Sequence, residues 1–483
     1  MFFSKLMKDM LGSITIMGSL FFGLGCTPVS VIQETNPVPL AFPGAEGFGK
    51  YTTGGRGGKV YLVNNLEDDG EGSLRQALNR SGSKIIVFNV SGTIHLKSPM
   101  NIKANTTIAG QTAPGDGICI ADQPVKIDGD NVIIRYMRFR MGDRYQNTGK
   151  IHGAGSDDAL SANRKKNIII DHCSISWSTD EVLSVYAGDS TTIQWSIISE
   201  PLNYSYHFEK GGDDFQHHGY GGIIGGRHIS IHHNLYAHCQ SRTPRFDGIR
   251  NLKDDVELAD FTNNVIYNWG GNNVYGGEGG NYNIVNNYYK SGPNTKKSVM
   301  YRVANPFKRE NEIPFGKYFI DGNFVHGSPG VTIDNWKGVV MDKGTDVDVA
   351  LAKMENPHPV ISVGLQKSMD AYNAVMNDAG ASFRRDTLDQ RIINDVKNGT
   401  GRIIDVQGGF PHGTAYEQTK HAWPVLRSTS PLADADHDGM PDEWEKKNDL
   451  NPLDASDASG YHLNKYYTNV EVYVNSLIKT KDF

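Results

Sequence analysis

The segment IIIDHCSI at residues 168–175 decides the fold, because its pattern returns along the chain. A short run rich in β-branched residues is followed by a polar step and then by another short apolar run. The same order occurs in VIIRYMRF (132–139), TIQWSII (192–198), ISIHHNLY (229–236), FTNNVIY (261–267), YNIVNNY (282–288) and FIDGNFV (319–325). A strand-rich unit that recurs every 20 to 40 residues, roughly, is typical of a solenoid. The repeat predicts an all-β chain folded as a parallel β-helix.

The polar steps of these segments align on five residues: Asp171, His232, Asn263, Asn286 and Asp321. In a stacked coil, equivalent turns lie above one another, so Asn and Asp side chains can form ladders that satisfy buried backbone groups. We expect these five residues to occupy one register. A β-sandwich would also contain short strands, but its hairpin signals would recur roughly every 8–12 residues, and few occur here.

The repeat occupies about residues 41–345, and the composition changes after it. Three later segments have the apolar spacing of helices, namely 346–355, 365–379 and 385–397. A solenoid exposes the faces of its sheets, so a following segment can cover them. We predict that residues 346–430 form a helical and loop extension packed on the outside of the solenoid.

The composition is that of an ordinary globular protein, neither disordered nor a multi-span membrane protein. Of the 483 residues, 38% are hydrophobic and 21% are charged, and the mean hydropathy is −0.44. The 48 basic and 54 acidic residues leave a net charge of −6, so the overall field does not attract a polyanion. We expect no nucleic-acid partner, and we expect a monomer.

The N-terminus has the features of a secretion signal. Lys5 and Lys8 precede an apolar run at residues 11–24 that is too short to span a bilayer comfortably. Cys26 follows a small residue, which resembles a bacterial lipoprotein cleavage site. Ordinary cleavage nearby is the alternative. We predict a signal peptide over residues 1–26.

A Pro-bearing linker follows at residues 27–40. The signal predicts export from a bacterial cell, to the periplasm or to the surface as a lipoprotein, and otherwise secretion. On the lipoprotein interpretation, a lipid on Cys26 is the only expected contact with a membrane.

Six motifs follow one another in the solenoid segment: TTGGRGGKVYLVNNLEDDGEGSLRQAL (52–78), KIIVFNVSGTI (84–94), IRYMRFR (134–140), DALS (158–161), IDHCSIS (170–176) and RTPRF (242–246). Together they resemble the pectate lyase superfamily, polysaccharide lyase family 1, over roughly residues 41–345. The resemblance implies a right-handed parallel β-helix. It also implies a calcium-dependent β-elimination site on one face of the coil.

The chemistry of that elimination requires definite parts. Cleaving a 4-linked uronate removes the proton from C5, and the charge that develops beside the sugar carboxylate must be stabilised. Ca²⁺ prefers carboxylate oxygens and suits this task. The family's calcium ligands imply Asp158 and Asp180 here. The next family Asp is replaced by Ser184, so Glu181 or Asp157 is expected to take part, or the substrate carboxylate completes the shell.

The resemblance also implies the residues that act on the sugar. Arg242 falls on the family's R-x-P motif and is implied as the base that removes the C5 proton. Arg245, three residues later, would bind a uronate carboxylate bidentately. The family's following Arg is replaced by Asp247. Lys210 is the candidate for a family lysine near the site, within the insertion at residues 204–222.

Two groups of histidines could be mistaken for metal ligands. One group lies at the polar steps of the repeat and is predicted to pack in the turns: His172, His232 and His233. The other lies in the Gly- and Asp-rich insertion: His207, His217 and His218. For this second group two interpretations stay open, a position along the substrate cleft and a position on a surface loop.

A second calcium signal lies near the C-terminus. The segment DADHDGMPDEWE at residues 434–445 matches the twelve-residue EF-hand loop, with acids at positions 1, 3, 5, 9 and 12 and Gly at position 6. The predicted ligands are Asp434, Asp436, Asp438, the Met440 carbonyl, Asp442 and Glu445. We predict that residues 431–483 hold a structural Ca²⁺ between short helices. The alternative is a solvated acidic turn.

The leading hypothesis is an exported, Ca²⁺-dependent pectate lyase acting on polygalacturonate, an acidic plant polysaccharide. A hydrolase resembling polygalacturonases is one alternative, with its paired carboxylates among Asp157, Asp158 and Asp180. A non-catalytic carbohydrate-binding or adhesin β-helix is the other.

Overall fold

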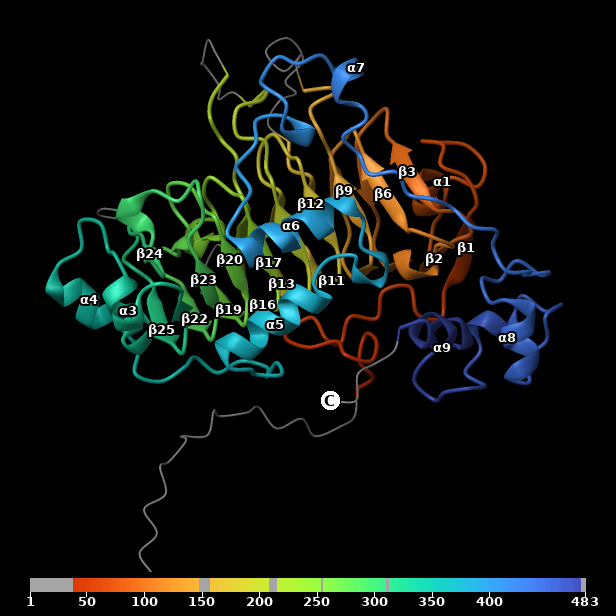
Figure 1. Ribbon diagram of the computed structural model, residues 1–483. Coiled ribbons are helices and arrows are strands. Elements are labelled where there is room, and N and C mark those ends of the chain that lie inside the picture. The colour runs from red at the N-terminus through yellow and green to blue at the C-terminus, as the bar shows by residue number, and fades with distance from the viewer. Residues whose placement is uncertain (1–37, 147–156, 208–214, 253–254, 310–311, 479–483) are drawn as a thin grey trace, which may run out of the picture. The chain divides into compact units, whose positions relative to one another are not determined.

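The repeated segments form coils in which every strand pairs in parallel with the equivalent strand of the next coil (Figure 1). The computed structural model describes residues 38–146, 157–207, 215–252, 255–309 and 312–478. The predicted signal peptide, Cys26 and Lys210 lie outside the described residues. All of these described residues belong to one compact unit. The predicted parallel β-helix is confirmed.

Three parallel sheets, here named A, B and C, run along the coil. Sheet A contains β1 (Lys59–Val63), β2 (Lys84–Phe88), β5 (Thr106–Ala109), β8 (Val132–Arg135), β11 (Lys166–Asp171), β13 (Leu183–Gln194), β16 (Ile229–His232), β19 (Leu258–Thr262), β22 (Asn281–Val285) and β25 (Lys317–Asp321). Sheet B contains β3 (Gly92–His95), β6 (Ile118–Ala121), β9 (Arg138–Arg140), β12 (Ser174–Ser176), β14 (Ile197–Ser199), β17 (Leu235–Ala237), β20 (Val265–Tyr267), β23 (Tyr288–Lys290) and β26 (Phe324–Val325).

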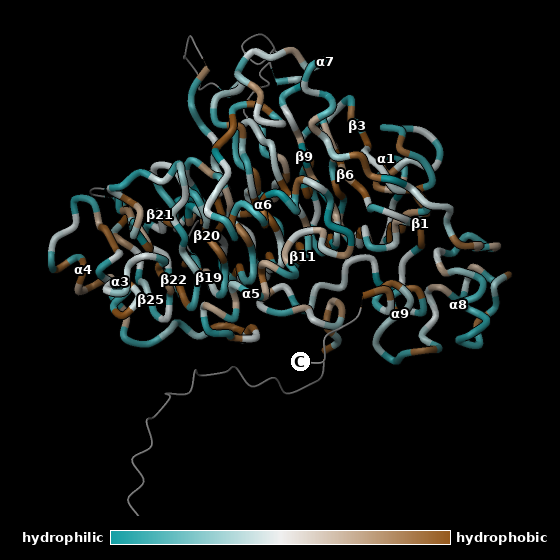
Figure 2. The backbone as a smooth tube through the Cα atoms, in the orientation of Figure 1, coloured by the Kyte–Doolittle hydropathy of each residue, from teal (hydrophilic) through white to brown (hydrophobic). Residues whose placement is uncertain are grey.

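Sheet C contains β4 (Met100–Ile102), β7 (Val125–Ile127), β10 (Leu160–Asn163), the first part of β13, β15 (Ile223–Gly226), β18 (Arg245–Phe246), β21 (Tyr275–Gly276) and β24 (Asn305–Pro306). Each complete coil passes from sheet C to sheet A and then to sheet B. Hydrophobic residues recur along the strands (Figure 2), and their inward-facing side chains fill the interior as one core.

A ladder of buried amides joins successive coils. The backbone N–H of Asn234 donates to Oδ1 of Asn264 at 3.0 Å, and the N–H of Asn264 donates to Oδ1 of Asn287 at 2.8 Å. Asn323 continues the ladder by accepting from the N–H of Asn287 at 2.9 Å. The Asn264 amide also donates to the Ile231 carbonyl at 2.8 Å. These asparagines are fully buried, so the ladder satisfies polar groups that water does not reach.

The predicted register is wrong by one residue in two coils. The positions equivalent to Asp171 are, coil by coil, Gln194, His232, Thr262, Val285 and Asp321. Asn263 and Asn286 come one residue later, at the corner between sheets A and B, with φ of 58° and 54°. Each is the first of two consecutive asparagines. The first takes the left-handed corner that Asn tolerates, and the second enters the ladder.

Two of the three histidines at the polar steps pack in the turns, whereas His232 is the buried last residue of β16. His172 and His233 occupy the same left-handed corner as Asn263, and their rings belong to a stack along the coil. The ring centroids of Trp195 and His233 are 4.2 Å apart, and those of Tyr136 and His172 are 4.7 Å apart. Burial lowers the pKa of His233 to about 4, so this ring is neutral in the folded protein at neutral pH.

The remaining elements are short helices. The α-helices are α1 (Leu74–Asn79), α3 (Pro329–Ile333), α4 (Asp346–Ala352), α5 (Ser368–Asp378), α6 (Thr387–Asn398), α7 (Tyr416–Thr419), α8 (Asp442–Lys447) and α9 (Asn469–Ser476). The 3₁₀ turns are η1 (Gly110–Thr112), η2 (Gly248–Arg250), η3 (Lys297–Val299), η4 (Asn335–Gly338), η5 (Ser382–Arg384), η6 (Gln407–Gly409) and η7 (Asp457–Ser459). The helices predicted at 346–355, 365–379 and 385–397 correspond to α4, α5 and α6.

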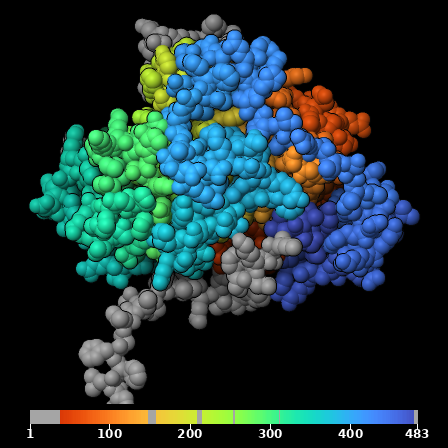
Figure 3. Space-filling view, viewed as in Figure 1, coloured from red at the N-terminus to blue at the C-terminus, as the bar shows by residue number. Residues whose placement is uncertain are grey.

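The extension covers the outer face of sheet B. Met376 of α5 and Ile392 of α6 are buried in one apolar cluster with Leu235 and Val265 of sheet B. Figure 3 shows this segment, in light blue, over the middle of the face in view. The extension therefore packs on the outside of the solenoid.

The terminal segment packs on the outer face of sheet A at the first coils. Met440, Ala458 and Val470 share an apolar cluster with Ile85 and Val87 of β2. Figure 1 shows α8 and α9 beside β1 and β2. Among the described residues, no helix is both long enough and apolar enough to cross a membrane.

The ladder leads to a stability prediction. Asn264→Ala should lower the free energy of unfolding by about 1–3 kcal/mol for each buried donor left without an acceptor. The N–H and the side-chain amide of Asn234 both lose Oδ1 of Asn264 in this variant. Urea unfolding measures the change, with Asn281→Ala, at a half-buried position of β22, as the control. Equal stability of the two variants would contradict a structural role for the ladder.

Candidate active site

Four of the predicted site residues lie where the chain leaves sheet B and enters sheet C of the next coil. Asp158 precedes β10, Asp180 and Glu181 precede β13, and Arg242 precedes β18. Parallel stacking places these entry segments side by side, because Glu181 bridges to Tyr220 and Tyr220 bridges to Ser241. Residues from distant parts of the sequence therefore meet along one edge of sheet C.

A groove of about 760 Å³ runs along this edge. Asp158, Asp180, Glu181 and Arg242 all line it. The structure thus brings together four of the residues that the sequence predicted for catalysis and metal binding.

Three carboxylates converge in the groove. One oxygen from each of Asp158, Asp180 and Glu181 lies within 4.8 Å of the other two. The backbone N–H of Glu181 donates to Oδ1 of Asp158 at 3.0 Å, which holds the two coils in this arrangement. Burial and then the charge of Asp180 raise the pKa of Asp158 well above its ordinary value. The cluster therefore carries unfavourable charge that a cation would relieve.

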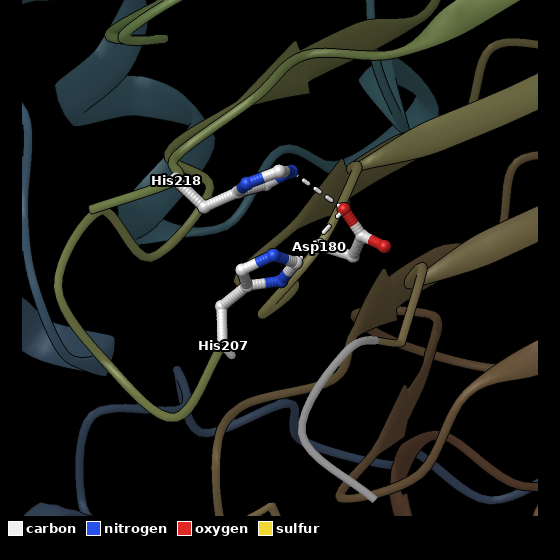
Figure 4. A group of neighbouring side chains, drawn as sticks. All are labelled: Asp180, His207 and His218. Atoms are coloured by element: carbon white, nitrogen blue, oxygen red, sulfur yellow. Dashed lines mark ion pairs between the residues drawn. The ribbon is translucent and has the colours of Figure 1, made fainter. Parts of the chain in front are cut away.

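Two histidines of the insertion reach the same cluster (Figure 4). Nε2 of His218 lies 2.6 Å from Oδ1 of Asp180, and Nδ1 of His207 lies 3.9 Å from the same oxygen. Their rings stack with centroids 3.7 Å apart. Burial raises the pKa of Asp180, but the hydrogen bond and charge of His218, with the charge of His207, outweigh it and lower that pKa.

The two interpretations left open for these histidines apply to different residues. His207 and His218 line the groove. His217 stacks instead on Tyr204, with centroids 4.4 Å apart, and lies 3.0 Å from the Asn203 amide. His217 is a loop residue.

Arg242 extends across the neighbouring coil to reach the acids. Its guanidinium lies 4.3 Å from the centre of the Tyr220 ring, and Nη1 forms an ion pair with Glu181. Nε donates to the Tyr275 hydroxyl at 3.2 Å. The side chain is 21% exposed, so it is fixed by three partners and still faces the groove.

The donor set fits a calcium ion. Asp158, Asp180 and Glu181 supply hard carboxylate oxygens, which Ca²⁺ prefers. Oε1 of Glu181 is buried, and its ionic contacts are with the guanidinium of Arg242 and, at 3.9 Å, with Nε2 of His218. Ser184 lies on the floor of the same groove, at the position where the resemblance implies a further Asp. Of the two residues proposed to replace that Asp, the structure places Glu181 in the cluster.

Arg245 is not in the groove. Its side chain is 10% exposed, and Nη2 lies 2.8 Å from Oε1 of Glu278, which is also buried. Nη1 donates to the Phe246 carbonyl at 3.0 Å. A guanidinium that is paired with a buried carboxylate is not available for a bidentate contact with a sugar carboxylate. The prediction that Arg245 binds substrate therefore finds no support in this arrangement, and Lys210 lies outside the described residues.

Sequence reasoning missed the floor of the groove. Asn101, Lys126, Ser161 and Ser184 lie side by side on adjacent strands of sheet C and line the groove. Lys126 is exposed between two buried neighbours of β7. The alternation of apolar and polar residues in this strand is the sequence signal for an outward-facing lysine, and β7 carries none of the family motifs.

The terminal acids form a separate cluster. Oxygens of Asp434, Asp436 and Asp438 lie within 4.8 Å of one another, and those of Asp438, Glu445 and Asp457 do likewise. Oδ1 of Asp442 accepts instead from the Ala435 N–H at 2.8 Å. The Met440 side chain is buried in the core, and the role of its carbonyl stays a prediction. Asp457 lies beyond the EF-hand pattern, which is why sequence reasoning missed it.

Comparison with known proteins supplies the family. No family model matches the chain. A protein named probable pectate lyase C from Aspergillus flavus is 35% identical over 465 residues, covering 93% of this chain and 96% of the relative. Its namesake from Aspergillus terreus is 34% identical over 450 residues, covering 91% and 94%. The chain belongs to the pectate lyase family.

Solved structures are less similar to this chain. The cedar pollen allergen jun a 1 has a TM-score of 0.49 at 15% identity, over 70% of this chain and 92% of the allergen. A pectate lyase bound to a hexasaccharide has a TM-score of 0.48 at 16% identity, over 70% and 97%. Members of the pectate lyase family are polysaccharide lyases.

The position of Arg245 leads to a prediction about stability. Arg245→Met should lower the free energy of unfolding by up to about 3–5 kcal/mol, because buried Glu278 then keeps only the more distant guanidinium of Arg250, whose Nε lies 3.9 Å from Oε2. Adding Glu278→Gln should restore part of the loss, since the unpaired charge is removed. Arg227→Met, which removes the exposed pair with Asp255, should cost less than about 1 kcal/mol.

Urea unfolding of the four proteins measures these differences. If Arg245→Met were as stable as the unchanged protein, the pair with Glu278 would not be structural. Arg245 would then be available for the substrate role predicted from the sequence.

Proposed function

We propose that this protein is an exported, Ca²⁺-dependent pectate lyase that cleaves polygalacturonate by β-elimination, with Arg242 as the base. The observation that carries the proposal is the convergence of Arg242 with Asp158, Asp180 and Glu181 in one groove. Acids alone would suit several reactions. An arginine held beside them by Glu181, Tyr220 and Tyr275 supplies the further group that an elimination needs.

In the proposed reaction, Arg242 accepts the C5 proton of a uronate held in the groove. The C5–H electrons form a C4=C5 double bond, the C4–O bond breaks, and the departing oxygen takes a proton from water. The hydroxide that remains takes the C5 proton from Arg242, which restores the neutral base. The products are an unsaturated uronate and a new reducing end. A guanidinium is normally protonated in proteins, and the ion pair with Glu181 favours that charged form. The step requires the neutral guanidine, so a cation bound by Glu181 would have to replace Arg242 as the partner of this carboxylate.

Asp158, Asp180 and Glu181 would hold the calcium ion. Bound there, Ca²⁺ supplies electrostatic stabilisation to the carboxylate of the sugar as charge develops beside it. His218 keeps one oxygen of Asp180 in place by its short contact, and the N–H of Glu181 does the same for Asp158. These contacts fix the orientation of the carboxylates before substrate arrives.

The floor of the groove suits an acidic chain laid across the coils. Asn101, Ser161 and Ser184 are small polar residues that leave room and offer hydrogen bonds. Lys126 is the cation on this floor, and we propose that it pairs with a uronate carboxylate one or more sugars away from the reacting one. It takes the role that the sequence had suggested for Arg245 and Lys210.

The alternatives differ in products. A hydrolase would need one carboxylic acid and one carboxylate at glycosidase separation, and the raised pKa of Asp158 beside the lowered pKa of Asp180 is the feature that favours it. The names of the relatives favour the lyase. Polygalacturonate assays with calcium and with chelator separate the cases. A lyase gives near-ultraviolet absorbance, a hydrolase gives reducing ends without it, and an adhesin gives binding alone.

Export is part of the proposal because Lys5 and Lys8 precede an apolar run of signal-peptide length. The predicted anchor at Cys26 rests on a bacterial lipoprotein pattern, whereas the curated relatives named above are fungal. We therefore propose export without a lipid on Cys26. Mass spectrometry of the mature N-terminus would decide between the two forms.

The base assignment leads to the sharpest kinetic prediction. Arg242→Lys keeps a positive charge but loses the planar fork that contacts Glu181 and Tyr275 together. We expect kcat to fall at least about a hundredfold with little change in thermal stability. Arg227→Lys, at an exposed ion pair away from the groove, is the matched control. A variant at position 242 with unchanged kcat would remove Arg242 from the mechanism.

The calcium assignment predicts a change in metal dependence. Asp158→Asn and Asp180→Asn should each raise the calcium concentration needed for half-maximal activity by about tenfold or more, because one ligand charge is lost. Activity should recover partly at high calcium. Asp189→Asn, on the exposed side of β13, is the control. If both groove variants kept the unchanged calcium dependence, the metal would be bound elsewhere.

A further inference from the structure

The terminal acidic cluster contains buried carboxylates whose negative charge is not neutralised by any residue that the structure describes. Glu445 is 0% exposed, and neither of its carboxylate oxygens has a hydrogen-bond partner. Asp438 is 2% exposed, and its Oδ2 also lacks a partner. An ionised carboxylate removed from water without a donor or counter-charge is strongly unfavourable.

Neighbouring acids add further negative charge without partners. Both oxygens of Asp436 and one oxygen of Asp457 are buried without hydrogen-bond partners. Asp438 and Glu445 meet Asp457 on one side, and Asp438 meets Asp436 on the other, with oxygens within 4.8 Å in each group. Among the residues that the structure describes, no Lys, Arg or His forms an ion pair with any of these four acids.

The other acids of the loop have different tasks. Oδ1 and Oδ2 of Asp434 accept from the N–H groups of Asp438 and Gly439 at 3.2 and 3.0 Å. Asp442 accepts from the N–H of Ala435. These contacts shape the loop so that the unpartnered oxygens of the remaining acids point toward one another.

We propose that Asp436, Asp438, Glu445 and Asp457, with Asp434 at the edge, bind a calcium ion that holds the terminal segment on the solenoid. Carboxylate oxygens in this number are the donor set of Ca²⁺, whereas Mg²⁺ keeps several waters and Zn²⁺ prefers nitrogen and sulfur. The new element is Asp457. It comes from η7, outside the EF-hand loop, so the ion joins two separate parts of the segment.

The position of the ion gives it a structural consequence. Met440, in the loop, and Ala458, in η7, are both buried against Ile85 and Val87 on the outer face of sheet A. An ion held by Asp438, Glu445 and Asp457 fixes the loop and η7 relative to each other, and so fixes both apolar contacts at once. The ion therefore acts as a clamp that keeps the first coils covered.

This clamp is independent of the groove and of the proposed lyase activity. Its test uses calcium binding and stability without substrate. Calcium titration by calorimetry of the full chain should detect this site in addition to any groove site. Glu445→Gln and Asp457→Asn should each weaken the terminal site at least about tenfold. Asp449→Asn, an exposed acid between them in sequence, should leave it unchanged.

Thermal melts give a signature that a merely structural carboxylate would not produce. In calcium, Glu445→Gln should melt below the unchanged protein, because ion binding to the folded state is weakened. In chelator the order should reverse, because the variant removes a buried, unpaired charge. Proteolysis should release the terminal segment readily in chelator and, for Glu445→Gln, also in calcium.

Each outcome decides part of the proposal. Unchanged calcium binding in both variants would overturn the site. Loss in Glu445→Gln with none in Asp457→Asn would overturn the role of Asp457 and leave an ordinary EF-hand loop. Tighter binding of Mg²⁺ or Zn²⁺ than of Ca²⁺ would overturn the choice of ion. If Glu445→Gln failed to fold, the isosteric change at the less buried Asp457 would carry the test.

Discussion

The hydrogen-bonded stacking of each coil on the previous one is the constraint on which the rest of the molecule depends. Parallel pairing at roughly 4.8 Å between strands leaves no freedom for one coil to slide along another. The ladder through Asn234, Asn264 and Asn287 enforces the same register at the corner, from inside. The position of any loop residue is thereby fixed by the strand that follows it.

That constraint assembles the groove. Asp158, Glu181 and Arg242 belong to different coils and share no local sequence context. Each stands just before a strand of sheet C, so stacking brings them to one edge, where contacts such as that of the Glu181 N–H with Asp158 hold them in place. Tyr220, on the coil between Glu181 and Arg242, supports the long side chain that bridges them. A rigid coil with variable entry loops can thus carry a polar site without weakening its core.

The fold followed from the sequence because the repeat of short apolar runs and polar steps is a physical signature of stacked coils. The error at Asn263 and Asn286 came from doublets of asparagine, in which only backbone conformation distinguishes the corner from the ladder. Motif matching also assigned roles to two arginines without information on their surroundings. Arg242 and Arg245 share a motif, yet one faces the groove and the other is buried against Glu278.

Other parts of the site could not follow from local patterns. His218 reaches Asp180 by the path of an insertion, and spacing along the chain does not reveal that path. Asp457 approaches Glu445 only when η7 folds back on the loop. Lys126 becomes a candidate substrate-binding residue only once its strand is known to border the groove. In each case the missing information was a tertiary contact between segments that have no shared motif.

The two acidic clusters offer similar carboxylate donors but differ in the positive groups around them. In the groove, Arg242 and His218 already balance part of the charge of Glu181 and Asp180, and the cluster opens on a cavity. A cation bound there would neutralise only the part of the negative charge that these side chains leave, and it could also contact whatever enters the cavity. Such an arrangement suits a site where charge changes during a reaction. In the terminal segment, Glu445 is sealed from solvent and has no such partner among the described residues. A cation there would be the whole counter-charge, so it would stay as long as the segment stays folded. Two sites of similar donors therefore differ in exchange and in function because of the positive groups placed around them.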